Sequence, residues 1–180
     1  MKRLAAGLSL AMLLACAPAF AAPAHIDAAV PQARVAGSGT FTYFGMKIYT
    51  AELFVGPQGY APGAPFALEL RYARNLKGKK IAEASVDQME KIGAGSPAQR
   101  QQWLRQMTAI FPDVAEGNRI TGVKAGNGGA RFYLDGNAIG AIDDPAFAAA
   151  FFGIWLDPAS TAPELRRALL KQAAAPGPSQ

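Results

Sequence analysis

Residues 37–55 read GSGTFTYFGMKIYTAELFV, and this stretch decides the fold prediction. Its content of aromatic and β-branched residues predicts one long β-strand over the whole segment. Alternation places Phe44, Met46 and Ile48 on one side, which we expect to face a hydrophobic core. The opposite side is unusually aromatic for a solvent-facing surface and carries Phe41, Tyr43, Lys47, Tyr49 and Leu53. A lysine between two tyrosines either holds the anionic end of a ligand or reaches out to water.

Further strands are predicted on both sides of this segment. A short first strand is expected over residues 28–35, although Pro31 interrupts it. Residues 66–72 alternate between apolar and polar side chains, as a half-buried strand does. The glycine-rich residues 125–129 and the pair Asp135 and Gly136 are predicted to form hairpin connections. The later strands are expected over residues 119–124, 130–134 and 137–142.

Two helices are predicted between the third and fourth strands. Residues 79–92 carry an apolar stripe at helical spacing. A second helix follows, with Ser96 as its N-cap and Pro97 at its first position, where the missing N–H of proline costs nothing. Apolar residues recur at helical spacing from Trp103 until Pro112 ends the run. We expect this stripe to be core.

Two more helices are predicted after the last strand. Asp143 and Asp144 are expected to cap a helix that begins at Pro145, and residues 161–164 have the form of a capping box for a final helix through Lys171. Hairpin connections among the later strands imply an antiparallel sheet with helices gathered on one face. The prediction is therefore an α+β fold and not a nucleotide-binding α/β fold.

The first residues are predicted to be a signal peptide, residues 1–22. Lys2 and Arg3 precede an apolar stretch of 12 residues, and small residues at Ala19 and Ala21 suit a signal peptidase. The apolar stretch is too short for a stable membrane span, so a periplasmic or secreted protein is expected. A competing interpretation is a lipoprotein anchored through Cys16. The domain is then expected over residues 23–172, followed by a flexible tail over residues 173–180.

The composition of the exported chain excludes several classes of site. Cleavage would remove the only cysteine and leave His25 as the single histidine, close to the new N-terminus. We therefore expect no disulfide framework, no Cys/His nucleophile pair, no metal site and no cofactor. The mature chain is mildly basic and has no block of lysines and arginines, so nucleic acid is not an expected partner.

Three polar motifs have ordinary structural explanations. Gly37 and Gly39 resemble a phosphate loop, but no helix follows, so a bulge or tight strand start is expected. Asp143 and Asp144 suit helix capping better than acid–base chemistry. The cluster that stays as a candidate ligand-binding site joins two aromatic-rich strands and consists of Tyr43, Lys47, Tyr49, Tyr72 and Arg74. The alternative explanation for this cluster is structural: the tyrosines lie at the rim of the sheet, and the cations extend into water without binding a ligand.

Taken in order, these motifs resemble the chalcone isomerase-like family, in its bacterial exported branch, over roughly residues 33–171. The resemblance rests on the Gly-x-Gly pair, on residues 47–54 and 68–74, on the helix end at residues 103–113, and on residues 136–144 and 154–157. It implies an open-faced β-sandwich, in which a large antiparallel sheet is covered by helices and a ligand cleft lies between them.

The resemblance does not carry the isomerase chemistry over. True chalcone isomerases use an arginine, a threonine and a tyrosine, whose places in this chain hold Phe41, Phe44 and a residue near Ile81. Without the cation the largest electrostatic contribution to catalysis is missing. Other members resemble non-catalytic fatty-acid binders that hold a carboxylate with an arginine and a tyrosine. Here Lys47 with Tyr49, or Tyr72 with Arg74, would have to substitute.

The expected function is binding of a small apolar or amphipathic molecule, such as a fatty acid, without catalysis. One alternative is an isomerase or lyase acting on a chalcone-like or enone substrate, with Lys47 or a tyrosine as its base. A second alternative is an envelope interaction protein that contacts a protein partner of unknown identity through the loop at residues 56–63 or the outer face of the sheet.

Overall fold

The computed structural model describes residues 22–124 and 128–174. The predicted signal peptide, apart from residue 22, and residues 175–180 of the predicted tail lie outside this range. So do residues 125–127, the first three of the predicted hairpin connection at residues 125–129.

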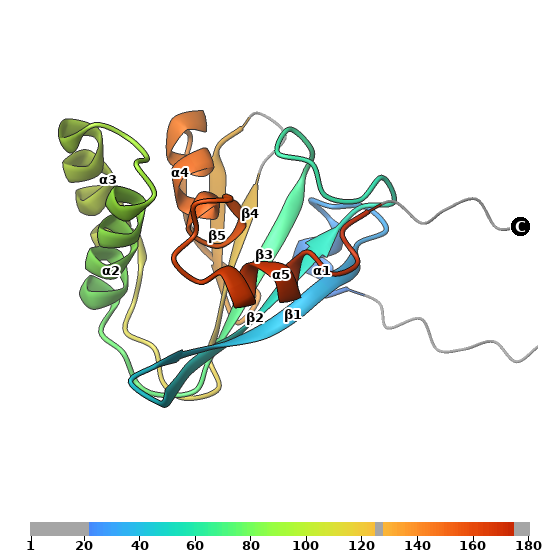
Figure 1. Cartoon of the computed structure of the whole chain (residues 1–180), viewed down its shortest axis with the longest axis horizontal. Helices are drawn as coiled ribbons and strands as arrows, with labels where there is room; N and C mark the ends of the chain where they lie inside the picture. Colours follow the sequence, from blue (N-terminus) through green and yellow to red (C-terminus); the bar gives the residue numbers. More distant parts are fainter. Residues whose placement is uncertain (1–21, 125–127, 175–180) are drawn as a thin grey trace, which may run out of the picture.

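Six strands form one sheet in the order of the sequence, and each strand is antiparallel to the next. This confirms the predicted α+β class. The strands are β1 (Arg34–Tyr43), β2 (Met46–Val55), β3 (Phe66–Tyr72), β4 (Arg119–Lys124), β5 (Ala130–Leu134) and β6 (Asn137–Ile142). The helices are α1 (Ala24–Asp27), α2 (Gly78–Lys91), α3 (Pro97–Ile110), α4 (Pro145–Leu156) and α5 (Pro163–Leu169), and Figure 1 shows their arrangement.

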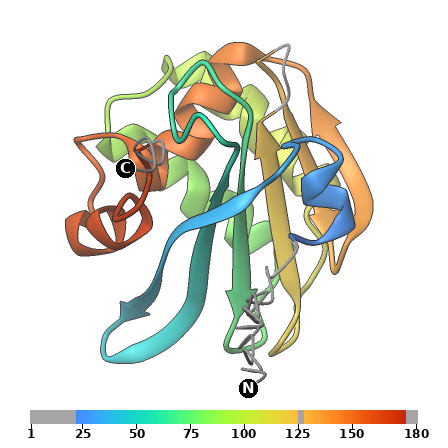
Figure 2. The ribbon, with the colours of Figure 1, turned by 90° about the vertical axis from the view of Figure 1, so that its right-hand side faces the viewer.

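Helices α2, α3, α4 and α5 lie on one face of the sheet, as the sequence predicted, and the short α1 lies on the other (Figure 2). Alternation along β3 shows the two faces. Leu68 and Leu70 belong to the large core under the helices, whereas Ala67 packs with Ile26 of α1 and Val123 in a small second core. We call the face of the sheet that α2, α3, α4 and α5 cover the inner face, and the face that carries α1 the outer face.

The prediction of one long strand over residues 37–55 is wrong. The segment is a hairpin of β1 and β2, closed by the pair Tyr43 and Met46 with Phe44 and Gly45 between them. Both turn residues have positive φ, 47° and 74°, which is the geometry of a type I′ turn. The expected core positions of Phe44 and Met46 are wrong for the same reason, because both side chains are exposed at the turn.

Two local predictions also fail. Residues 28–33 form no strand, since β1 begins only at Arg34. The predicted capping box of the last helix is absent, because Ala162 is the N-cap and makes no side-chain cap bond. The Thr161 hydroxyl instead donates to Oε1 of Gln88 on α2. A tertiary hydrogen bond has replaced the local one.

The pair Gly37 and Gly39 serves helix packing. A bulge interrupts the β1 register between Val35 and Gly37, as expected for the Gly-x-Gly segment. A Cβ at Gly37 would lie 2.1 Å from the carbonyl oxygen of Ala168, and one at Gly39 would lie 2.7 Å from Cδ1 of Leu165. Glycine at both positions therefore lets α5 rest directly on the backbone of β1.

The stripe of α3 is core, as predicted, and Trp103 is its centre. Only 1% of this residue is exposed, and its ring lies so close to Gly95 that a Cβ there would be 2.4 Å from Cζ3. The indole Nε1 donates to Oδ2 of Asp144 at 2.9 Å. The other carboxylate oxygen of Asp144 accepts from the Ala146 N–H and caps α4, so one side chain joins two helices.

Truncating Trp103 tests this core. Trp103→Ala is expected to lower the free energy of unfolding by ~3–5 kcal/mol, because it removes a large buried ring and leaves Asp144 without its partner. Denaturant unfolding measures the change. The neighbouring Gln102→Ala, at an exposed position, is the control and should change stability by less than about 0.5 kcal/mol. A similarly small loss of stability in both variants would contradict the assignment of Trp103 to the core.

Candidate ligand-binding site

A cavity of about 410 Å³ lies between the inner face of the sheet and helices α2 and α4. This volume is in the range of small-molecule sites. Its walls are mostly apolar. The sheet contributes Phe41, Tyr49, Leu70 and Tyr72, and the helices contribute Ile81, Phe151, Ile154 and Trp155.

The polar groups inside the cavity are phenol hydroxyls. Nε1 of Trp155 donates to the hydroxyl oxygen of Tyr49 at 3.0 Å, which leaves the Tyr49 O–H free to donate elsewhere. The ring of Tyr72 packs edge-on against Tyr49, with 6.1 Å between the ring centroids. Tyr72 is only 3% exposed, and within the described part of the chain its hydroxyl has no hydrogen-bond partner. The cavity therefore offers two donors to a bound molecule.

Both phenols are neutral at ordinary pH. Burial raises the pKa of Tyr49 to about 12, and the hydrogen bond from Trp155 only partly offsets this. Burial also raises the pKa of Tyr72, and the neighbouring Tyr49 adds to the effect. A phenol that keeps its proton donates hydrogen bonds and is a poor general base. The pair is thus suited to hold a carbonyl or carboxyl oxygen.

The charged residues that line the cavity lie at its rim, on α2. Lys80, Asp87 and Lys91 are exposed, and Lys80 forms an ion pair with Glu83 at 2.8 Å. Among the described lining residues, Lys80 and Lys91 are the cations. An anionic group deep in the cavity would therefore meet phenols and apolar rings and would lack a neighbouring positive charge.

The structure brings three of the predicted site residues to this cavity, namely Tyr43, Tyr49 and Tyr72. Their role in binding remains a prediction. Tyr43 is 57% exposed and lies toward the tip of the β1–β2 hairpin, whereas Tyr72 is buried.

Lys47 does not share a face with Tyr43 and Tyr49, so that expectation is wrong. Phe41 pairs with Tyr49 and Thr42 pairs with Lys47, which leaves Ile48 as an extra residue on β2. Such a bulge breaks strict alternation. Ile48 and Tyr49 both line the cavity, and Lys47 is turned to the outer face.

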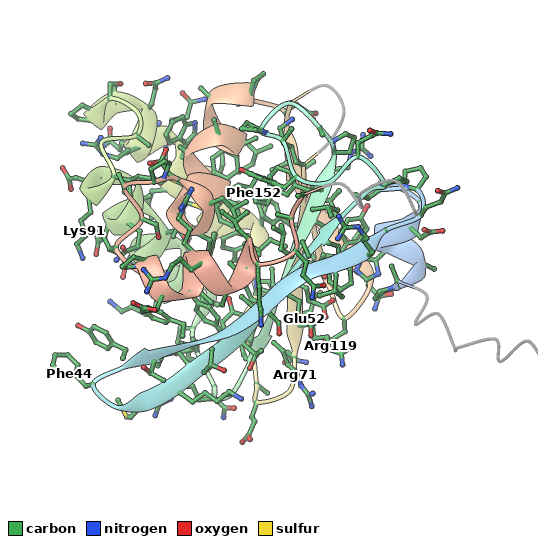
Figure 3. The ribbon with its side chains drawn as sticks, turned by 45° about the vertical axis from the view of Figure 1, so that its right-hand side comes forward. Phe44, Glu52, Arg71, Lys91, Arg119 and Phe152 are labelled. Carbon is green, nitrogen blue, oxygen red and sulfur yellow. The ribbon has the colours of Figure 1, made fainter. Side chains whose placement is uncertain are left out.

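On the outer face Lys47 lines a charged groove of about 380 Å³. Glu52, Arg71 and Arg119 line the same groove, and Figure 3 shows these three side chains close together beneath the sheet. Arg74 lines neither hollow; its Nη1 contacts Sδ of Met46 at 3.1 Å. The predicted pairing of Tyr72 with Arg74 around one ligand therefore does not form.

His25 is also far from the cavity, on α1 at the outer face. Its Nε2 lies 3.2 Å from the hydroxyl of Thr121, which donates to Glu69 at 3.0 Å, and its ring contacts Tyr133. Burial lowers the pKa of His25, which the charge of Glu69 partly offsets. Although His25 lies close to the predicted new N-terminus, it is held in place, because Ile26 of α1 packs against the sheet.

The cavity residues that sequence reasoning missed come mainly from helices. Ile81 and Ile154 carry no chemical signal of their own. The sequence of α4 did carry a signal. This helix is apolar on all sides, which is typical of a helix that is buried on several sides. Within residues 22–124 and 128–174 no cluster of three or more potential metal-ligating side chains occurs. In the same residues no helix has the length and apolar character needed to cross a bilayer.

The raised pKa of Tyr49 predicts how stability changes at alkaline pH. Because the phenol binds its proton more tightly folded than unfolded, its contribution is fully present below pH 10 and is lost as the pH rises toward 12. Stability should therefore fall between pH 10 and 12, and less steeply in Tyr49→Phe than in the parent protein. Denaturant unfolding at several pH values measures both slopes. Equal slopes would show that Tyr49 is not the group responsible.

The comparisons with known proteins agree with this architecture. A family model described as chalcone isomerase-like matches residues 21–171. An uncharacterized protein of Haemophilus influenzae is 29% identical over 135 residues, which cover 74% of this chain and 66% of that protein. The crystal structure of a fatty-acid binding protein of Arabidopsis thaliana superposes with a TM-score of 0.65 at 13% identity, over 81% of this chain and 91% of that one. The chain belongs to the chalcone isomerase-like family.

Proposed function

We propose that this protein is an exported, non-catalytic binder of a small amphipathic molecule with an apolar tail, such as a fatty acid. The observation that carries the proposal is the cavity of about 410 Å³, whose walls are apolar and whose inner polar groups are two protonated phenols. Burying a tail against these rings is favourable, at roughly 0.8 kcal/mol per methylene. The similarity in fold to a fatty-acid binding protein supports the same ligand class.

The polar end of the ligand is assigned to Tyr49 and Tyr72. The unpartnered hydroxyl of Tyr72 and the free O–H of Tyr49 donate to one or two oxygens of the head. Because the lining cations lie at the rim, a protonated acid or an ester fits this end as well as a carboxylate does. The sequence had instead suggested that Lys47 or Arg74 binds the head of the ligand through its positive charge.

Export is part of the proposal and rests on the sequence alone. Lys2 and Arg3, the apolar stretch and the small residues before residue 22 form a signal peptide in the expected order. The mass of the protein recovered from the periplasm tests this, since cleavage after Ala21 and lipidation at Cys16 give different masses.

Binding is favoured over the isomerase alternative by the same geometry. The base candidates named from the sequence were Lys47 and a tyrosine. Lys47 is on the outer face, and the two inner phenols hold their protons up to strongly alkaline pH. Incubation with chalcones and related enones provides the direct test, with Tyr49→Phe as the control for any turnover.

Native mass spectrometry of the purified protein is expected to show a lipid-sized adduct, and added palmitate should bind one molecule per chain. Methyl palmitate is expected to bind nearly as well, because the phenols need only an oxygen acceptor. Binding of the acid with complete rejection of the ester would contradict the assigned head position. No adduct and no palmitate binding would contradict the proposed function.

Tyr72→Phe provides the residue-level test. Loss of one hydrogen bond should weaken palmitate binding by about 0.5–1.5 kcal/mol, which is up to roughly tenfold. The stability of the free protein should not fall, since no described protein group loses a partner. Tyr133→Phe, which alters a half-buried tyrosine on the outer face, is the matched control for titration and thermal unfolding. Equal affinities for the two variants would remove Tyr72 from the site.

A further inference from the structure

The tip of the β1–β2 hairpin carries an exposed apolar cluster, defined here as Tyr43, Phe44 and Met46. Phe44 is 85% exposed, Tyr43 57% and Met46 47%. Among the described residues, the large hydrophobic side chains that are exposed are these three and Val35. Scattered exposed apolar residues need no explanation, but three at one tip do. Figure 3 shows Phe44 at the far end of the hairpin, beyond the helices.

The backbone gives no reason for an aromatic residue at the tip. Phe44 has φ 47°, a left-handed conformation that asparagine and glycine adopt most easily and that is strained for a bulky residue. Type I′ turns accordingly favour Asn-Gly. Phe44 thus has neither a favourable backbone nor a buried side chain, and such a conflict with local preference is typical of a functional position.

Cations flank the apolar tip. Lys47 follows it directly and is exposed, and the guanidinium of Arg74 lies on the sulfur of Met46 at 3.1 Å. Within the described residues neither cation belongs to an ion pair. Apolar side chains at a tip with unpaired cations behind them match the two layers of an anionic bilayer surface, namely acyl chains and negative headgroups.

The tip is continuous with the cavity. The ring of Tyr43 lines the cavity and packs edge-on against the ring of Phe44, with 4.5 Å between their centroids. A membrane that received Phe44 would therefore lie beside the cavity opening.

We propose that the hairpin tip inserts into the surface of an anionic bilayer, with Phe44 as the anchor and with Lys47 and Arg74 on the headgroups. The protein is then a peripheral membrane binder, positioned to exchange its ligand with the lipid phase. Only this exchange step rests on the proposed function, because insertion depends on the tip alone.

Co-sedimentation of the purified protein with vesicles tests the insertion. Binding is expected with equal parts of phosphatidylcholine and phosphatidylglycerol and should be much weaker with phosphatidylcholine alone. Phe44→Asn should weaken vesicle binding roughly tenfold, because a buried aromatic side chain is lost. Its thermal midpoint should be unchanged or higher, since asparagine suits the positive φ. Lys47→Glu should weaken binding by at least fivefold, mainly to the anionic vesicles.

Val35→Thr, which changes an exposed apolar residue at the opposite end of β1, is the matched control and should bind vesicles like the parent. Equal vesicle binding by the parent and Phe44→Asn would overturn the proposal. The proposal would also be overturned if the parent protein bound neither kind of vesicle and formed a dimer that Phe44→Asn abolishes, since the tip would then join two copies. Native mass spectrometry of Phe44→Asn should still show the adduct, so failure of insertion and failure of ligand binding are separate results.

Discussion

The antiparallel pairing of β1 with β2 is the constraint on which the site and the surface of this protein depend. One extra residue on β1, Ala36, and one on β2, Ile48, interrupt the register. The second interruption divides the aromatic and cationic residues of the hairpin between two environments. Ile48 and Tyr49 enter the cavity, whereas Lys47 joins the charged groove of the outer face. A hairpin without the bulge would keep strict alternation and would turn Lys47 to the side of Tyr49.

The polar groups inside the cavity are the phenol hydroxyls of Tyr49 and Tyr72. The Tyr72 side chain lines the cavity, and within the described residues its hydroxyl has no hydrogen-bond partner, so it is available to a bound molecule. Its neighbour Tyr49 is held by Trp155 and directs its own proton away from that bond. The walls around both are rings and branched aliphatic side chains from the sheet and from α4. Such a site favours an oxygen acceptor on an apolar body, and it gains little from a full negative charge.

The apolar and the charged side chains of the β1–β2 hairpin lie in different regions of the molecule. Near the middle of the molecule the inner face of β2 serves the cavity, while the outer face is polar. At the tip, Phe44 and Gly45 form the type I′ turn, and no other described element covers them. The apolar side chain of Phe44 therefore faces water. The position of Tyr43, in contact with Phe44 and in the cavity wall, joins the two regions. The groove of the outer face, where Lys47 and Arg71 lie beside acidic residues, adjoins the tip, because Lys47 directly follows the exposed Met46.

The sequence by itself determined the elements whose signals are local. Ser96 and Pro97 start α3, Gly136 marks a tight turn, and alternation along residues 66–72 delimits β3, because caps, positive φ and side-chain period act over a few residues. Of the five residues in the predicted site, Tyr43, Tyr49 and Tyr72 line the cavity, whereas Lys47 and Arg74 do not. Tertiary structure alone decided which face each residue took. The turn at Phe44 and Gly45 divided one apparent strand into two, the bulge at Ile48 reversed Lys47, and Thr161 bonded Gln88 instead of capping its own helix. In each case pairing between distant segments, which no local pattern records, outweighed the local preference.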